Sequence, residues 1–430
     1  MRVRLAFALV LALFLVGCGD DAGFFSTLTT ATTLAPITST TGAPATTATT
    51  WAETTTTTVP PVGEWAWSLL ASDGSAFGGM PPVQGVIALA AGGPGLVAVG
   101  TEYTEAEGDV AVWTSLDGRA WSRVPHDESV FGGEGLQYPL GVAAGGPGLV
   151  AVGVDEAGGD PDAAVWTSPD GLVWARVPHD EAVFGGNDLQ TMTSVTTGGP
   201  GLVAVGADGS GGDWVLAVWT SPDGLNWERL PLNGAALGGS SGQRAEQVVA
   251  WSGGLVAVGE AISEEGYCAA VWVSPDGVNW SRVPHDEAVF GGEGTQSMES
   301  VALGGPGLVA VGFDGPPGEF DGAVWTSPDG VVWSRVADDG AVFGGEGSQV
   351  ISEVLAVGGG LVAVGREELP AGPVLAVWTS PDGLSWSRLP HEEAVFGHSA
   401  DLRSLSATAA VPGLVVVDGG GALWVAAPAG

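Results

Sequence analysis

Arg244, Arg366 and Arg403 lie outside the arginine position that the copies of an internal sequence repeat share, and all three fall in its variable segments. A guanidinium group binds a carboxylate through two parallel hydrogen bonds, so arginines that converge on one funnel could hold an acidic ligand. The alternative is that Glu246, Glu299 or other nearby acids neutralise these arginines. Both interpretations predict charged chemistry in the variable segments.

A second set of candidates follows a recurring glutamine, which is expected to hydrogen-bond to the backbone. The residue at this next position varies among the copies, with arginine in two of them, and is expected at the mouth of a central channel: Gly85, Tyr138, Thr191, Arg244, Ser297, Val350 and Arg403. A residue shared by all copies builds the repeating unit, whereas a residue found once is available for chemistry. Tyr138, Arg244, Arg366 and Arg403 are therefore the predicted ligand-binding residues.

The repeat itself is marked by the phrase Gly-Leu-Val-Ala-Val-Gly and its variants. The leucines of this phrase are each separated from the next by 53 residues: Leu96, Leu149, Leu202, Leu255, Leu308, Leu361 and Leu414. Strict periodicity of this length is typical of propellers and solenoids, in which each copy is one supersecondary unit.

One copy, residues 190–242, predicts four short antiparallel strands. An apolar run of four residues, Leu202 to Val205, suits a strand that is covered on both faces. The tight turn Ser221-Pro-Asp-Gly224 then joins a strand ending at Thr220 to one beginning at Trp227. Four strands without helical periodicity predict a propeller blade.

The two chain ends predict how the ring closes. The last copy lacks a fourth strand, and the stretch Trp65-Ala-Trp67-Ser-Leu-Leu70 near the N-terminus resembles the missing piece. An N-terminal strand that completes the C-terminal blade removes two exposed sheet edges. The predicted fold is therefore all-β, a seven-bladed β-propeller of four-stranded antiparallel blades with 53-residue repeats.

The two faces of this propeller are expected to differ. The Gly-Gly-Pro-Gly and Ser-Pro-Asp-Gly turns, nearly invariant, belong to one face. The loops between the second and third strands belong to the other, with equal lengths but different and mostly acidic sequences: residues 101–109, 154–162, 207–215, 260–268, 313–321 and 366–374. Such loops on a rigid scaffold are what a recognition surface needs.

The links between blades run beside these loops. Their repeated phenylalanines are expected to plug between blades, and their histidines to serve packing or hydrogen bonding rather than metal binding: Phe131, Phe184, Phe290, Phe343, Phe396, His126, His179, His285 and His391. Asp127, Asp180, Asp286 and Asp339 could gather calcium, but no loop has EF-hand spacing, which favours a solvated acidic rim. No metal site and no cofactor is predicted.

Six repeated arginines each follow a tryptophan by two residues and are expected to stack on it: Arg123, Arg176, Arg229, Arg282, Arg335 and Arg388.

The turn Ser168-Pro-Asp170-Gly171, followed by Trp174, resembles the Asp-box, the bacterial neuraminidase repeat of sialidase-like propellers. The spacing is one residue shorter than the usual pattern. In that family the box is a hairpin element away from the active site, so the resemblance implies the fold and says little about activity.

The same resemblance implies an enzyme as the alternative function, a sialidase-like glycoside hydrolase. Tyr138 would be its nucleophile, Glu246 or Glu299 its base, and the three non-repeat arginines its carboxylate clamp. Against this, such enzymes usually have six blades, and their arginine-isoleucine-proline motif is absent from this sequence.

The N-terminal residues predict export. Met1-Arg-Val-Arg4 is basic, an apolar stretch follows, and Leu15-Val-Gly-Cys18 resembles a bacterial lipobox, which implies cleavage before Cys18 and a lipid on its sulfur. The alternative is an ordinary secretory signal. The predicted organisation is a signal peptide (1–17), a lipidated, threonine-rich tether (18–62) and the propeller (63–430), anchored to the outer side of a bacterial membrane.

The composition excludes some classes of binding partner. The formal net charge is -37, or -39 without Arg2 and Arg4, and the chain has no lysine. Such a charge argues against nucleic acid and against anionic headgroups. Cys268 is the one cysteine besides Cys18, so no disulfide framework is expected. The sequence favours a monomeric, membrane-anchored binding or scaffold module for a protein, glycan or cell-wall ligand.

Overall fold

A computed structural model describes residues 65–77, 84–103, 108–157, 159–231, 237, 242–263, 266–337, 339–345, 347–397, 401–402, 404–410 and 413–428. The chain divides into two units, residues 1–58 and Val59–Gly430, and the described residues all belong to the second. The predicted signal peptide, the Cys18 lipidation site and the tether lie outside the described residues. Among the residues described, no helix is both long and apolar enough to cross a membrane.

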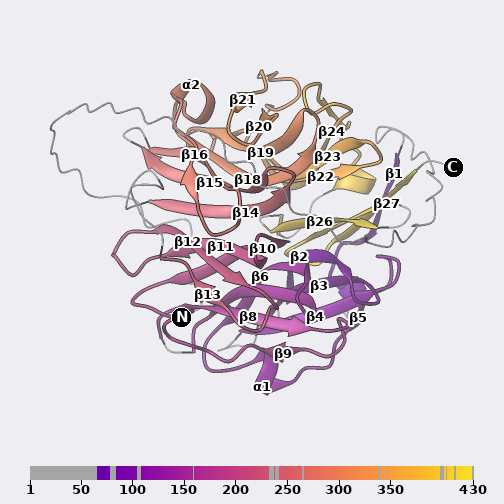
Figure 1. Cartoon of the computed structure of the whole chain (residues 1–430). Coiled ribbons are helices and arrows are strands. Elements are labelled where there is room, and N and C mark those ends of the chain that lie inside the picture. Colours follow the sequence, from indigo (N-terminus) through magenta and orange to yellow (C-terminus); the bar gives the residue numbers. More distant parts are fainter. Residues whose placement is uncertain are drawn as a thin grey trace, which may run out of the picture. The chain divides into compact units, whose positions relative to one another are not determined.

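The second unit consists of seven four-stranded antiparallel sheets, which confirms the predicted fold class (Figure 1). The first strands of the sheets are β2 (Gln84–Gly92), β6 (Gln137–Gly145), β10 (Gln190–Gly198), β14 (Gln243–Trp251), β18 (Thr295–Gly304), β22 (Gln349–Val357) and β26 (Leu405–Ala410). The second strands are β3 (Gly95–Tyr103), β7 (Gly148–Asp155), β11 (Gly201–Asp208), β15 (Gly254–Ser263), β19 (Gly307–Gly315), β23 (Gly360–Leu369) and β27 (Gly413–Asp418).

The third strands are β4 (Gly108–Ser115), β8 (Asp162–Ser168), β12 (Val215–Ser221), β16 (Gly266–Ser274), β20 (Asp321–Ser327), β24 (Gly372–Ser380) and β28 (Leu423–Pro428). The fourth strands are β5 (Ser122–Arg123), β9 (Ala175–Arg176), β13 (Glu228–Arg229), β17 (Ser281–Arg282), β21 (Ser334–Arg335), β25 (Ser387–Arg388) and β1 (Trp65–Ala71). Short helices complete the described elements: η2 (Ser75–Phe77), α1 (Glu128–Phe131), α2 (Glu287–Phe290) and α3 (Glu393–Phe396). We number the blades 1 to 7 in the order of their first strands.

The first strands contact one another from blade to blade and form the inner wall of a ring, because β26 packs against β2 as each earlier first strand packs against the next. The fourth strand of blade 7 is β1, which pairs antiparallel with β28, with Trp65 opposite Pro428. The prediction that the N-terminal strand closes the ring is therefore confirmed.

The two faces also differ as predicted. The turn at Gly146 lies against Asp223 and Gly224, so the turns between first and second strands meet the Ser-Pro-Asp-Gly turns of the next blade. On the opposite side, the backbone NH of Gln190 donates to the Pro161 carbonyl, so the link between blades meets the loop between second and third strands. We call these the turn face and the loop face.

Large aromatic side chains lock neighbouring blades together. Trp166 of β8 is fully buried, and its indole NH donates to the Val130 carbonyl of the preceding link at 2.8 Å. Phe131 from that link is 3% exposed and packs in one cluster with residues of blades 1 and 2. The predicted role of the repeated phenylalanines as plugs is confirmed.

Five of the six repeated arginines stack on tryptophans, but not on those two residues before them. The guanidinium carbon of Arg123 lies 5.1 Å from the ring centre of Trp113, its partner across the β4–β5 pair. The Trp121 indole instead donates to the Gly118 carbonyl. The predicted pairing was wrong, because a cross-strand neighbour on the sheet is closer than a residue near the turn.

The Ser-Pro-Asp-Gly turn is held by its own side chains. Ser168 Oγ accepts a hydrogen bond from the Gly171 NH, and Asp170 Oδ1 accepts from the backbone NH groups of Leu172 and Val173. Trp174 then donates its indole NH to the Gly171 carbonyl. These bonds pair the backbone polar groups of the turn with side chains of the same turn, which explains why its residues recur.

Side-chain oxygens join the inner strands of five of the seven pairs of neighbouring blades. At one position of the repeat, an oxygen accepts the backbone NH of the next blade: Ser194 from Val248, Gln247 from Val301, Ser300 from Val354, Glu353 from Ala407 and Ser406 from Leu89. Glu353 is the one acid in this set. Burial raises its pKa to about 8, although the bonds from Ala407 and Ser406 oppose the shift.

Replacing Glu353 with glutamine is expected to make the protein less sensitive to alkali. An acid whose pKa rises on folding contributes its full stability below its unfolded pKa, and this is lost as the pH rises through the folded value, here about 8. The variant keeps the acceptor for Ala407, as Gln247 does for Val301. We expect the free energy of unfolding of the variant to exceed that of the wild type by about 2 to 4 kcal/mol at pH 9 and to match it near pH 4. Urea unfolding at both pH values measures these free energies, and Glu319→Gln, which changes an exposed acid, is the control. The same difference between the Glu353→Gln variant and the wild type at both pH values would contradict the prediction.

Candidate functional site

The most unusual group of side chains lies between the inner strands of blades 4 and 5, towards the loop face. We call Arg244, Glu246, Glu260 and Glu299 the Arg244 cluster. The Arg244 guanidinium forms an ion pair with Glu246, and its Nη2 lies 3.8 Å from Glu260 Oε1. Glu299 of β18 interacts electrostatically with all three. Three acids therefore share one cation.

The local backbone explains how these groups meet. Arg244 and Glu246 come from β14, and Glu260 stands opposite Arg244 in the β14–β15 pair. The register shifts between Ala245 and Gln247, and β18 shifts again between Met298 and Ser300. Glu246 and Glu299 are thus the extra residues of equivalent bulges, which re-aim side chains at the edge of a sheet.

The electrostatics of the cluster follow from its burial and its excess of acids. Burial and the charge of Glu246 raise the pKa of Glu299 to about 7, although a hydrogen bond of 2.7 Å from Ser297 opposes the shift. Burial raises the pKa of Glu260 despite Arg244. Burial by itself lowers the pKa of Arg244, but the attraction of the three acids outweighs it and leaves the pKa above its usual value.

The cluster remains accessible from solvent. The side chains of Arg244, Glu246 and Glu260 are 23%, 17% and 19% exposed. Trp214 lies beneath the arginine, with its ring centre 5.8 Å from the guanidinium carbon. The cluster can therefore attract a positively charged group, and the aromatic ring offers an apolar surface beside it.

The sequence prediction found three of these residues and missed two. It associated Arg244 with Glu246 and Glu299, which the structure brings together, and the alternative of neutralisation holds for Arg244. It did not single out Glu260 and Trp214. Glu260 lies 16 residues after Arg244 in the sequence, and only the pairing of β14 with β15 brings the two residues opposite each other.

The other predicted ligand-binding residues lie elsewhere. Arg366 belongs to β23 in blade 6, with its Nε 3.5 Å from Glu368 Oε1, and Arg403 lies outside the described residues. Tyr138 belongs to β6 in blade 2. Burial raises its pKa, and the charge of Glu156 raises it further. The phenol is thus held in its protonated form.

The acids and histidines of the links have local partners. Asp127 Oδ1 accepts the backbone NH of Ser129 and caps α1, and the corresponding bonds occur at Asp180, Asp286 and Asp339. His126 lies 3.2 Å from Glu128, with its ring centre 6.3 Å from that of Phe131. Hydrogen bonding and packing of the histidines agree with the prediction.

The turn face offers less chemistry. A shallow hollow there is lined by Gly304, Gly305, Pro381 and residues 356–360, and none of these side chains titrates.

No protein-family profile and no curated protein matches this chain. Among solved structures it is similar to a polysaccharide lyase of family PL25, an ulvan lyase, with a TM-score of 0.48 and 13% identity over 80% of this chain and 94% of that one. The WD40 propeller domain of Doa1 has a TM-score of 0.47 and 12% identity over 84% and 97%. A thermostable family-43 glycoside hydrolase has a TM-score of 0.30 and 12% identity over 52% and 83%.

Proposed function

We propose that this protein is a binding propeller, held at the outer side of a bacterial membrane by a lipid on Cys18 and a threonine-rich tether, and that its loop face takes a ligand carrying a cationic group. The observation that carries this proposal is the Arg244 cluster, in which three partly accessible acids face one guanidinium. The ligand belongs to the classes that the sequence indicated, a protein, a glycan or a cell-wall component.

A cationic ligand would complement this site electrostatically, because its three acids outnumber its one guanidinium. Carboxylates that are taken out of water without a counter-charge have raised pKa values, as Glu260 and Glu299 do. A lysine side chain or an amino sugar entering the cluster would stabilise both ionised carboxylates. The acidic loops around it, together with the net charge of -37, would steer such a ligand towards the face.

The glycoside hydrolase alternative has less support from the geometry. Its arginine clamp would need free guanidinium groups, and Arg244 is already paired with Glu246. Its nucleophile would need an ionisable phenol, and the pKa of Tyr138 is raised by burial. Binding without catalysis accounts for these observations more directly.

The proposal predicts that decalysine binds the immobilised full chain and that the double variant Glu246→Gln/Glu299→Gln binds it at least about tenfold more weakly. Each lost charge-assisted contact is expected to cost about 1 kcal/mol or more, and tenfold is 1.4 kcal/mol. Surface plasmon resonance at low ionic strength measures both affinities. An amine-bearing chitosan oligosaccharide and its fully N-acetylated form tell a glycan ligand from a peptide ligand.

The control is Glu228→Gln, which removes one charge from the exposed outer strand β13 and is expected to change affinity by less than about twofold. Thermal unfolding checks that the double variant is folded. Equal affinity of the folded double variant and the wild type for every cationic probe would rule out the cluster as the binding site.

A further inference from the structure

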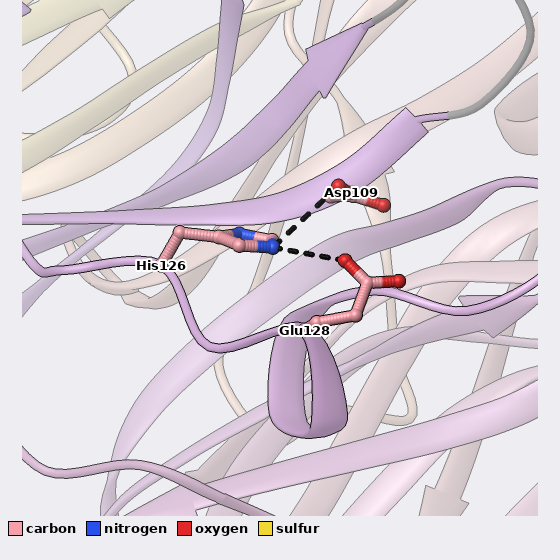
Figure 2. Close-up of side chains that lie close together, drawn as sticks. All are labelled: Asp109, His126 and Glu128. Carbon is pink, nitrogen blue, oxygen red and sulfur yellow. Dashed lines mark hydrogen bonds and ion pairs between the residues drawn. The ribbon is translucent and has the colours of Figure 1, made fainter.

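Blades 1 and 2 each bring one histidine and two carboxylates together at the outer part of the loop face. In blade 1 these are Asp109 from β4, His126 from the link and Glu128, the first residue of α1 (Figure 2). In blade 2 the equivalent residues, 53 positions later, are Asp162, His179 and Glu181. In each triad, one nitrogen and two oxygens lie within 4.8 Å of one another.

The same histidine nitrogen is close to both carboxylates. His126 Nε2 is 3.2 Å from Glu128 Oε2 and 3.8 Å from Asp109 Oδ2, and in blade 2 the corresponding distances are 3.2 Å and 3.7 Å. Figure 2 shows the imidazole edge pointing between the two acids. Tetrahedral zinc with bonds of about 2.0 Å separates its ligand atoms by about 3.3 Å. Both nitrogen–oxygen distances in each triad therefore lie within about half an ångström of this separation.

The backbone leaves room for the glutamate at this place. A Cβ on Gly132 would lie 2.6 Å from Glu128 Oε2, and one on Gly185 would lie 2.5 Å from Glu181 Oε2. The carboxylate therefore occupies space that a side chain at this glycine would fill. Packing of the His126 ring near Phe131 restrains the imidazole from the other side.

Other blades provide an internal comparison. Blade 6 keeps the pair His391 and Glu393 at 3.2 Å, but Val374 stands where the aspartate would be. The histidine–glutamate pair thus forms without the aspartate, as a hydrogen-bonded pair at the surface. The aspartate added in blades 1 and 2 is the group that turns this pair into a three-ligand arrangement.

We infer that Asp109, His126 and Glu128, and likewise Asp162, His179 and Glu181, each form a binding site for a divalent transition-metal ion such as zinc. One imidazole and two carboxylates give a donor set of charge -2 that neutralises the ion, and they leave a coordination position for water or a ligand. The imidazole favours zinc over calcium, which takes oxygen ligands. This inference revises the expectation that the links hold no metal, and it is independent of the Arg244 cluster.

The test is zinc titration of the full, EDTA-dialysed chain against a chromophoric zinc indicator. We expect the wild type to bind two more zinc ions than the double variant Asp109→Asn/Asp162→Asn, and each single variant to lose one. Gly132→Ala is expected to weaken zinc binding at the blade 1 site about tenfold, because it displaces Glu128 while every ligand is kept. A hundredfold excess of calcium should leave the zinc bound.

Glu393→Gln in blade 6 is the matched control and should keep the wild-type stoichiometry. Thermal unfolding in EDTA checks that all variants are folded. Equal zinc stoichiometry of the wild type and the folded double variant would overturn the inference, whether both bind zinc or neither does. Loss of one zinc ion in Glu393→Gln would also contradict it, because the aspartate would then not be what makes the site.

Discussion

Replacing Gly206 with alanine is expected to lower the free energy of unfolding by about 3 kcal/mol, although it adds a single methyl group. A Cβ at Gly206 would collide with the carbonyl oxygen of Thr191 on the paired inner strand. That carbonyl lies next to the bulge between Met192 and Ser194, where the pairing of β10 with β11 shifts register. Backbone cannot move aside as a flexible side chain can, so the strain has no easy relief. Urea unfolding followed by tryptophan fluorescence measures the change.

Blade 7 supports this explanation from within the protein. Its residue at the same repeat position is Asp418, and there β26 pairs with β27 without a register shift. At this repeat position, glycine thus accompanies the bulge, and the blade without a bulge has another residue there. The control is Gly211→Ala, since a Cβ there meets no atom within 4 Å, and we expect a change below about 1 kcal/mol. Similar unfolding midpoints for the two alanine variants would show that the close approach does not determine stability.

Removing strand β1 is expected to have the second large effect, by opening the ring at blade 7. Trp65 is 7% exposed and packs in one cluster with Leu414 and Trp424. Deleting a buried tryptophan alone typically costs about 3 to 5 kcal/mol, and the truncated protein also exposes the edge of β28. A chain that begins at residue 72 should therefore unfold at lower denaturant concentration and self-associate, as measured by urea unfolding and size-exclusion chromatography.

Two further chains separate this cause from a general effect of shortening. A chain that begins at Val59 keeps β1 and should unfold like the full chain. Because Trp65 pairs with Pro428, a chain that carries residues 65–71 after its C-terminus through a short turn should regain most of the lost stability. If the chain from residue 72 is as stable as the chain from Val59, the strand does not close the ring.

Much of the architecture could be predicted from local patterns. The 53-residue spacing of the leucines, the strand-length apolar runs and the Ser-Pro-Asp-Gly turns each depend on residues close in sequence. The turn is satisfied by hydrogen bonds spanning two to five residues, such as that from Gly171 to Ser168. Each of these local patterns recurs from copy to copy, which supports the same prediction several times. The additional strand near the N-terminus indicated how the ring closes. The lipid anchor, the tether and the ligand class stay predictions.

The candidate sites depended on residues that the sequence alone could not bring together. A variable position of the repeat marked Arg244, but only strand pairing placed Glu260 opposite it, and only the packing of blade 4 on blade 5 added Glu299. Arg123 stacks across the sheet on Trp113 rather than on its sequence neighbour. The histidine of each link met an aspartate 17 residues earlier in blades 1 and 2. Repeats thus determine the backbone through local contacts, whereas charges separated along the chain become partners only when strands and blades pack.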